Sequence, residues 1–126
     1  MESKGKEKLV IDYNKKTFTE EENEQIKREV NHILNKYPGY VPIICSSSNL
    51  KLQKHKYVVN RHLTFSEFVV SIRKKITKLN EKEGLFFLVN NIMVPLSSDI
   101  GTIYEQNKDS STNILQIWIS KENMFG

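Results

Sequence analysis

Cysteine is nearly absent from this sequence, since Cys45 is the one cysteine among 126 residues. A single thiol cannot form an internal disulfide, and such a composition fits a reducing compartment. We therefore expect a cytoplasmic protein. Cys45 stands inside an apolar run, where a small buried thiol is a better interpretation than a reactive nucleophile.

Long hydrophobic runs are missing as well. The longest uninterrupted apolar run covers residues 85–89, whereas a helix needs about 20 residues to cross a bilayer. Residues 1–8 are basic, but no apolar segment with a cleavage site follows them, so we expect neither a secretory signal nor a transmembrane helix.

Residue patterns that support catalysis or metal binding are also lacking. The five glycines are scattered and form no phosphate-binding loop, and no pair of carboxylates stands beside an obvious base. His32, His55 and His62 are not spaced with Cys45 or with one another as zinc ligands usually are. We expect no enzymatic activity, no cofactor and no metal site.

Positive charge, in contrast, is concentrated in one segment. Residues 37–80 contain eight lysines and arginines against one acid, so this segment has a charge of +7, whereas the whole chain has +4. A basic surface suits an acidic peptide, an anionic membrane or nucleic acid. A solvated lysine-rich face is the plainer interpretation, and charge alone leaves both open.

The strongest structural pattern covers residues 63–79. Thr64 and Glu67 have the spacing of a capping box, and Leu63 can pack on Phe68 at the fourth helical position. Apolar side chains recur at steps of three and four residues: Phe65, Phe68, Val69, Ile72, Ile76 and Leu79. This pattern predicts an amphipathic helix over residues 65–79 that packs through one face.

Extended, β-branched segments flank this helix at residues 41–45, 56–59, 85–90 and 114–119. Asp99 can begin a short helix before the last of them. The order of elements predicts an α+β fold of the ubiquitin-like β-grasp type, with a four-stranded mixed sheet around helix 65–79.

A second capping box, Thr19 with Glu22, predicts a helix that ends before Pro38. We therefore divide the chain into three parts. Residues 1–18 are expected to form a flexible basic arm, residues 19–38 an N-terminal helical extension, and residues 39–126 a ubiquitin-like domain with a conjugation tail at 120–126.

Two features suggest a function. The alternating segment 54–59 could lie at a sheet edge and pair with an extended peptide, although a protected lysine-rich edge fits the pattern equally well. The sequence ends at Gly126, and a terminal glycine has no Cβ, so its carboxylate can thread a narrow active-site channel and become an acyl donor.

Several blocks occur together in one order: Lys36-Tyr37-Pro38, Val41-Pro42-Ile43-Ile44, Lys56-Tyr57-Val58-Val59, Leu63-Thr64 through Phe68, Ile72-Arg73-Lys74-Lys75-Ile76, Leu85-Phe86-Phe87-Leu88-Val89-Asn90-Asn91 and Glu122-Asn123-Met124-Phe125-Gly126. Through these blocks, residues 33–126 resemble the autophagy ubiquitin-like modifiers, the group that includes GABARAP.

The resemblance implies a non-enzymatic modifier whose terminal glycine, here Gly126, passes from an activating enzyme to a conjugating enzyme and then to phosphatidylethanolamine. Lipid attachment would place the cytoplasmic domain on the autophagosome membrane without a spanning segment. A cysteine protease that removes the lipid is a further implied partner.

The resemblance also implies a site for short aromatic-x-x-aliphatic peptides of cargo receptors and autophagy proteins, added as a strand beside residues 56–59. The implied aromatic pocket consists of Glu29, Ile33, Pro42, Ile44, Lys56 and Ile114. The implied aliphatic pocket consists of Tyr57, Val58, Leu63, Phe68 and Ile72. Lys54 and Lys56 would meet acidic residues that flank such peptides.

Four positions depart from the family pattern: Tyr40 replaces a basic residue, Asn60 a proline, Ser71 a large aliphatic residue and Lys75 an arginine. Ser71 could loosen the aliphatic pocket, and Lys75 cannot make a planar two-pronged contact. These departures bear on peptide preference.

Two other functions stay open. One is an unconjugated peptide-binding or adaptor domain. The other is a modifier joined to a protein lysine, against which Phe125 argues, because that conjugate typically has tryptophan before its glycine. Nucleic acid is not an expected partner, and steep salt dependence without peptide competition would favour it.

Overall fold

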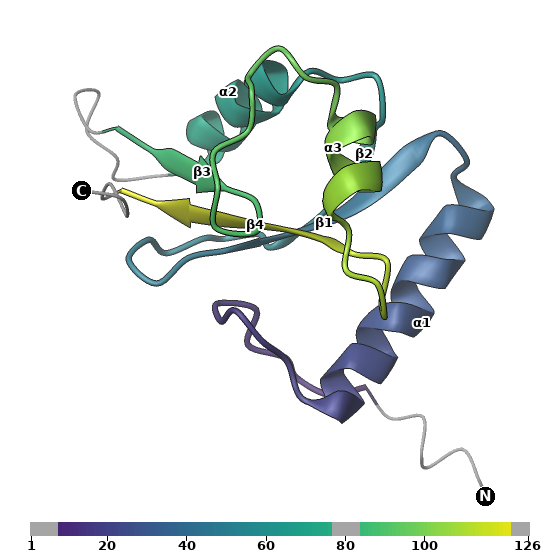
Figure 1. Ribbon diagram of the computed structural model, residues 1–126. Helices are drawn as coiled ribbons and strands as arrows, with labels where there is room; N and C mark the ends of the chain where they lie inside the picture. The colour runs from purple at the N-terminus through teal and green to yellow at the C-terminus, as the bar shows by residue number, and fades with distance from the viewer. Residues whose placement is uncertain (1–7, 77–83, 122–126) are drawn as a thin grey trace, which may run out of the picture.

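The computed structural model describes residues 8–76 and 84–121. Its centre is a mixed sheet with the strand order β2-β1-β4-β3 (Figure 1). Strand β1 (Tyr40–Ser46) pairs antiparallel with β2 (Lys56–Asn60) and parallel with β4 (Leu115–Ser120), and β3 (Phe86–Leu88) pairs antiparallel with β4. The predicted ubiquitin-like β-grasp is confirmed.

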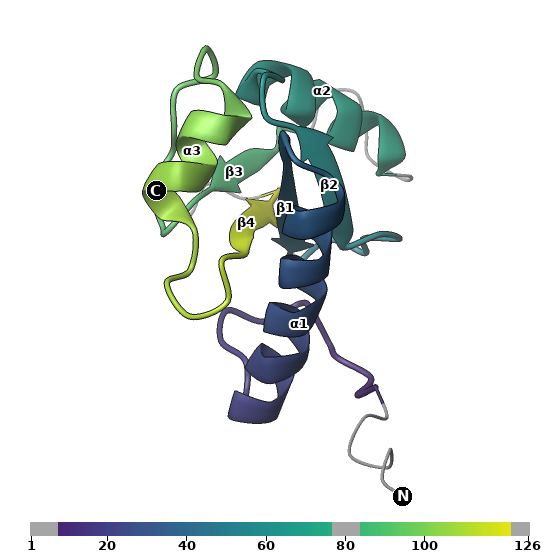
Figure 2. The same ribbon diagram turned by 90° about the vertical axis from the view of Figure 1, so that its right-hand side faces the viewer.

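The helices divide between the two faces of this sheet. Helices α2 (Phe65–Lys75) and α3 (Ile100–Asn107) cover one face, whereas α1 (Glu20–Lys36) lies on the other side (Figures 1 and 2). Because side chains alternate along a strand, Ile43 belongs to the large core under α2 and α3, while Ile44 belongs to a smaller cluster with α1. The sheet is therefore buried on both faces.

Both predicted capping boxes are present, at Thr19 with Glu22 and at Thr64 with Glu67. Helix α2 nevertheless ends earlier than predicted. Ile76 is extended and its N–H donates to the Arg73 carbonyl, while its side chain still packs against the core. The four-residue step from Ile72 to Ile76 is the same whether Ile76 continues the helix or leaves it in an extended conformation, so the spacing alone cannot predict where α2 ends. Residues 77–79 of the predicted helix lie outside the described part of the chain.

Pro42 lies in β1, an interior strand, and has no N–H to donate. No backbone hydrogen bond to β4 is lost there. Pro42 faces Val58 across the antiparallel pair, and the pairing of β1 with β4 begins only at Ile43. Strand β3 is shorter than predicted, because Asn90 and Asn91 have positive φ angles of 51° and 68° and turn the chain.

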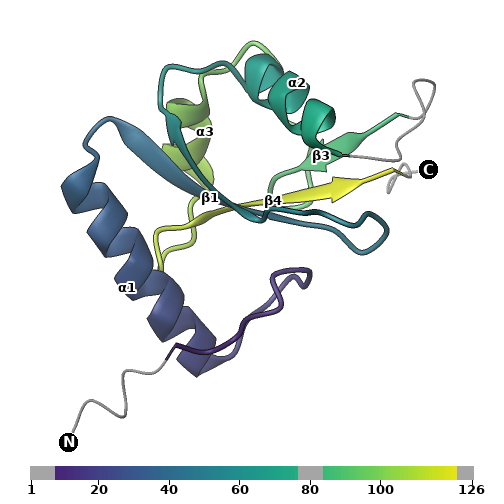
Figure 3. The ribbon, with the colours of Figure 1, turned by 180° about the vertical axis from the view of Figure 1, so that it is seen from behind.

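Residues 8–18, which we call the arm, cross the face of the sheet beside α1 (Figure 3). Asn14 Oδ1 accepts from the Ser47 N–H at 3.0 Å, and the Lys15 carbonyl accepts from Gln116 Nε2 at 2.8 Å. Three arm side chains pack on the smaller apolar cluster: Ile11, Tyr13 and Phe18. Residues 1–18 are predicted to form a flexible basic arm, and within it residues 8–18 make these contacts with the sheet and α1.

Candidate functional site

Strand β2 forms one edge of the sheet, and among the described strands it pairs only with β1. Its outward N–H and C=O groups can therefore pair with another extended chain. The side chains of Lys56, Val58 and Asn60 are exposed on one face, whereas those of Tyr57 and Val59 are half-buried on the other. A chain added along β2 would thus meet side chains on both faces of the sheet.

On the α1 face, a pocket of about 80 Å³ opens beside β2. We call it the α1 pocket. It is lined by Tyr13, Ile26, Glu29, Val30, Ile33, Pro42, Ile43, Ile44, Lys56, Tyr57, Val58 and Ile114. The six residues expected to form an aromatic pocket, Glu29, Ile33, Pro42, Ile44, Lys56 and Ile114, are all among them. They come from α1, β1, β2 and the residue before β4, so the fold rather than the chain order brings them together.

The polar groups of the α1 pocket are concentrated at one wall. Lys56 Nζ lies 3.3 Å from Glu29 Oε1 and 5.6 Å from the centre of the Tyr13 ring. Burial alone would lower the pKa of Lys56, but Tyr13 and the Glu29 carboxylate outweigh it, so the pKa is raised and the ammonium is kept charged. Glu29 Oε2 is buried without a hydrogen-bond partner among the described residues, which leaves an acceptor for an incoming N–H.

On the α2 face, a second pocket of about 110 Å³ is lined by Cys45, Leu52, Gln53, Lys54, Tyr57, Ile72, Lys75, Ile76 and Ile119. We call it the α2 pocket. Tyr57 and Ile72 were expected in the aliphatic pocket and lie here. Lys54 Nζ is 4.8 Å from the centre of the Tyr57 ring, so Lys54 flanks this pocket rather than the α1 pocket.

The remaining residues assigned to the aliphatic pocket lie elsewhere. Val58 lines the α1 pocket, because strand alternation turns it to the face opposite Tyr57. Phe68 is 1% exposed beneath Tyr57, whose ring it meets edge-on, and Leu63 packs half-buried against the core. These two side chains support the site from below and do not line the α2 pocket.

Cys45 has the surroundings of a structural thiol. It is 1% exposed, and this burial raises the pKa of its thiol, so the nucleophilic thiolate is disfavoured. Its carbonyl accepts from His55 Nδ1 at 2.8 Å. Across residues 8–76 and 84–121, no group of His, Cys, Asp or Glu side chains could hold a metal ion, and no helix is long and apolar enough to cross a membrane.

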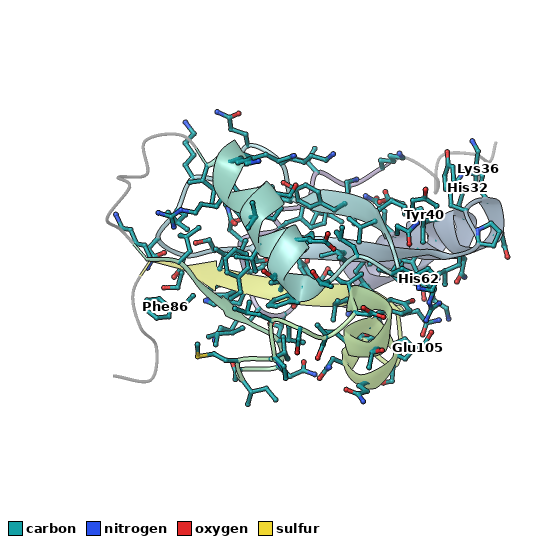
Figure 4. All side chains as sticks on the ribbon, turned by 90° about the horizontal axis from the view of Figure 1, so that it is seen from above. His32, Lys36, Tyr40, His62, Phe86 and Glu105 are labelled. Carbon is teal, nitrogen blue, oxygen red and sulfur yellow. The ribbon has the colours of Figure 1, made fainter. Side chains whose placement is uncertain are left out.

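The chain leaves the sheet at the end opposite α1 (Figures 1 and 3). Phe86, which pairs with Ser120 at the end of β4, lies far from Tyr40 and Lys36 (Figure 4). Asn49 holds this exit, since its Nδ2 donates to Ser120 Oγ at 3.0 Å and its Oδ1 accepts from the Lys121 N–H at 3.2 Å. The expected conjugation site, Gly126, lies outside the described residues.

Tyr13 is the one lining residue whose position depends on the arm. Its ring meets those of Phe18 and His55 at centroid distances of 6.1 and 5.9 Å. No local pattern in the sequence indicates this contact, because it requires the arm to fold back across the sheet. The apolar run Leu9-Val10-Ile11 indicates that the arm can hold a short element, but it does not indicate where Tyr13 lies.

Comparison with known proteins agrees with the fold. The sequence model of the family described as "Autophagy protein Atg8 ubiquitin like" matches residues 25–126. Autophagy-related protein 8 of Schizosaccharomyces pombe is 38% identical over 107 residues, which cover 82% of this chain and 87% of that protein. The protein of the same name from Pichia angusta is 40% identical over 107 residues, covering 82% and 84%.

A solved structure, the crystal structure of Trypanosoma brucei ATG8, superposes with a TM-score of 0.69 at 26% identity, covering 78% of this chain and 86% of that one. The resemblance to the autophagy modifiers is thus confirmed in sequence and in fold, and with it the expectation of a modifier rather than an enzyme. The chain belongs to the Atg8 family of ubiquitin-like autophagy proteins.

Proposed function

We propose that this modifier is attached through Gly126 to phosphatidylethanolamine, by way of an activating and a conjugating enzyme, and can be released by a cysteine protease. Membership in the family supports the proposal, and so does the place where the last strand ends. Strand β4 ends at Ser120, at the end of the sheet opposite α1, so the chain leaves the sheet away from the α1 pocket (Figure 1). The protein would then divide between the cytoplasm and the autophagosome membrane.

The test is mass spectrometry of the protein recovered from membranes of its own cells, beside a variant that lacks Gly126. We expect a phosphatidylethanolamine adduct on Gly126 that is lost with the deletion. A variant lacking Gly84 keeps the terminus and controls for expression. An unmodified terminus in cells whose conjugation enzymes are active would favour the unconjugated adaptor instead.

We propose further that β2 binds aromatic-x-x-aliphatic peptides of cargo receptors and autophagy proteins by strand addition. The observation that supports this best is that the α1 and α2 pockets lie on opposite faces of the sheet beside its free edge. Residues three apart in an extended peptide point to opposite faces. The aromatic side chain would enter the α1 pocket while the aliphatic side chain reaches the α2 pocket beside Tyr57.

Titration calorimetry with a synthetic peptide that contains Trp-Val-Asp-Leu after a run of acidic residues tests this proposal. We expect saturable binding that is lost when the tryptophan and leucine of the peptide are both replaced by alanine. Amide chemical shifts should change mainly along β2 (Lys56–Asn60). Shifts confined to α3 (Ile100–Asn107) would place the ligand elsewhere.

A further inference from the structure

The arm brings an aromatic ring of the protein itself to the α1 pocket. Tyr13 is half-buried there, with its ring 5.9 Å from that of His55 and 5.6 Å from Lys56 Nζ. Lys56 is therefore engaged on two sides, by Glu29 and by Tyr13. An incoming peptide would have to use the same lysine and the same apolar wall.

We propose that Tyr13 is a built-in competitor, which covers the α1 pocket and must move aside before the aromatic side chain of a peptide can enter. The inference rests on the proposed peptide-binding function and adds a regulatory element to it. The arm would set how strongly the edge strand binds its partners.

The size of the pocket is the first argument. With Tyr13 in place, its volume is about 80 Å³, whereas a buried cavity that takes up benzene has roughly 150 Å³. A phenyl ring, and still more an indole, exceeds the space that remains. Tyr13 is the lining residue that belongs to the arm, so its displacement enlarges the pocket while the sheet and α1 stay in place.

The chemistry of the arm is the second argument. Asp12 precedes Tyr13, so the arm presents an acidic residue followed by an aromatic one, as the expected peptides do. Asp12 is exposed. The arm thus resembles the ligand in the order of its charge and its ring, and it meets the same basic residue.

The attachment of the arm is the third argument. Before Tyr13, the Leu9 N–H donates to Gln25 Oε1 at 2.6 Å, and the Leu9 carbonyl accepts from Gln25 Nε2 at 3.2 Å. After it, Asn14 bonds the Ser47 N–H. These anchors keep the ring at a high effective concentration beside the pocket.

The arm is held only lightly just ahead of the segment that carries the ring. Val10 is fully exposed and Leu9 is 44% exposed, so these two residues bury little apolar surface, and Leu9 is held mainly by its hydrogen bonds to Gln25. Segments with few buried contacts open at low cost in free energy. The ring can therefore be displaced while the rest of the fold stays intact.

The test measures the affinity of a fluorescein-labelled peptide, containing Trp-Val-Asp-Leu after acidic residues, for the full-length chain by fluorescence anisotropy. Tyr13→Ala should bind roughly three- to tenfold more tightly than the parent. In the variant the α1 pocket is always open, so no binding free energy is spent on moving the Tyr13 ring aside. Tyr13→Phe keeps the ring and should bind within about twofold of the parent. Val10→Ala, which changes a fully exposed arm residue, should leave the affinity unchanged.

The outcomes separate the cover from the site. If Tyr13→Ala binds the peptide as well as the parent or more weakly, the proposal that Tyr13 competes with the peptide is wrong, whereas the proposed peptide site stands. Binding by Tyr13→Ala but not by the parent supports the cover. If neither protein binds, both proposals fail.

Nuclear magnetic resonance gives a readout that does not depend on the alanine variant. Nuclear Overhauser contacts between the Tyr13 and His55 rings should be present in the free protein and lost when the peptide saturates it. Contacts that persist in the saturated complex overturn the cover.

Discussion

Lys56 Nζ on the edge strand lies 3.3 Å from Glu29 Oε1 on α1, so one ion pair joins the two walls of the α1 pocket. The Lys56 side chain is 55% exposed, and exposed pairs of this kind contribute about 0–1 kcal/mol to stability. We therefore expect the ion pair to affect the affinity for a ligand in the α1 pocket more than it affects the free energy of unfolding.

Reversing the charge at the edge strand should weaken binding of a peptide with acidic residues before its aromatic side chain. We expect Lys56→Glu to lower the affinity about tenfold at low salt and clearly less at high salt, because screening reduces the repulsion. Calorimetric titration at two ionic strengths measures the effect. Unchanged affinity at low salt would remove β2 as the binding edge.

Lys121→Glu provides the matched control for that experiment. It makes the same change in net charge, but Lys121 lies seven residues beyond Ile114, which is roughly 23 Å along an extended chain. That separation from the α1 pocket, beside which the acidic residues of the peptide would lie, exceeds the Debye length of about 10 Å at moderate salt, so the control should lose much less affinity than Lys56→Glu.

The unpartnered Glu29 Oε2 predicts a preference among aromatic side chains. An indole N–H can donate to it, whereas a phenyl ring cannot, and a net hydrogen bond of about 1 kcal/mol corresponds to roughly a fivefold difference in affinity. We expect the parent to favour Trp-x-x-Leu over Phe-x-x-Leu by this factor and Glu29→Ala to bind the two peptides alike. A ratio that survives the substitution would assign the preference to ring size alone.

The elements of the fold that the sequence predicts well are those with local causes. Thr64 and Glu67 form their capping box from residues three apart, and Thr19 and Glu22 do the same, so α1 and α2 begin where the sequence indicates. The end of α2 is different. Ile76 continues the apolar spacing but leaves the helix, because packing against the core can be satisfied from either conformation.

The α1 pocket shows the same limit at the level of the site. Its wall residues could be assigned by family resemblance, since β1, β2 and α1 keep the family order. Tyr13 could not be assigned to the pocket from the sequence. Its position depends on hydrogen bonds between the arm and residues far along the chain, such as that between Lys15 and Gln116. The family resemblance assigns Val58 to the aliphatic pocket together with Tyr57, but alternation along β2 turns the two side chains to opposite faces, and Val58 lines the α1 pocket.

Gly101 in α3 has no room for a larger residue. A Cβ there would lie 2.8 Å from Arg61 Cβ and 2.9 Å from the Arg61 carbonyl oxygen. Neither atom is the free end of a side chain, so the backbone must shift, and we expect Gly101→Ala to destabilise the fold by about 1–3 kcal/mol. Urea unfolding measures the loss. Gly84→Ala, whose Cβ would meet Phe86 at 4.0 Å and nothing else among the described residues, should be close to neutral.

Asp109 predicts a pH dependence of stability. Burial would raise the pKa of its carboxyl, but hydrogen bonds donated by Ser111 and Thr112 to Oδ2 outweigh it, so the pKa lies below its ordinary value of 3.8. The carboxylate therefore contributes stability above pH 3.8, and this contribution is lost as the pH falls through the lower folded-state pKa. Asp109→Asn should lower Tm at neutral pH, and the difference from the parent should shrink on acidification below that value. A difference that stays constant with pH would mean that the charge is not involved.

Asn49 fixes the exit of the tail, and this predicts an effect on conjugation that is separate from peptide binding. Its side chain bonds both Ser120 and Lys121, the last described residues before the terminal glycine. Asn49→Ala should slow transfer of the chain from the conjugating enzyme to phosphatidylethanolamine vesicles several-fold, because the tail leaves the sheet in more directions. Peptide affinity should not change, since Asn49 lines neither pocket beside β2. Ser48→Ala, at the exposed neighbouring position, controls for the loop. Asn49→Asp keeps the acceptor for the Lys121 N–H and should restore part of the rate, an outcome that a general loss of stability would not produce.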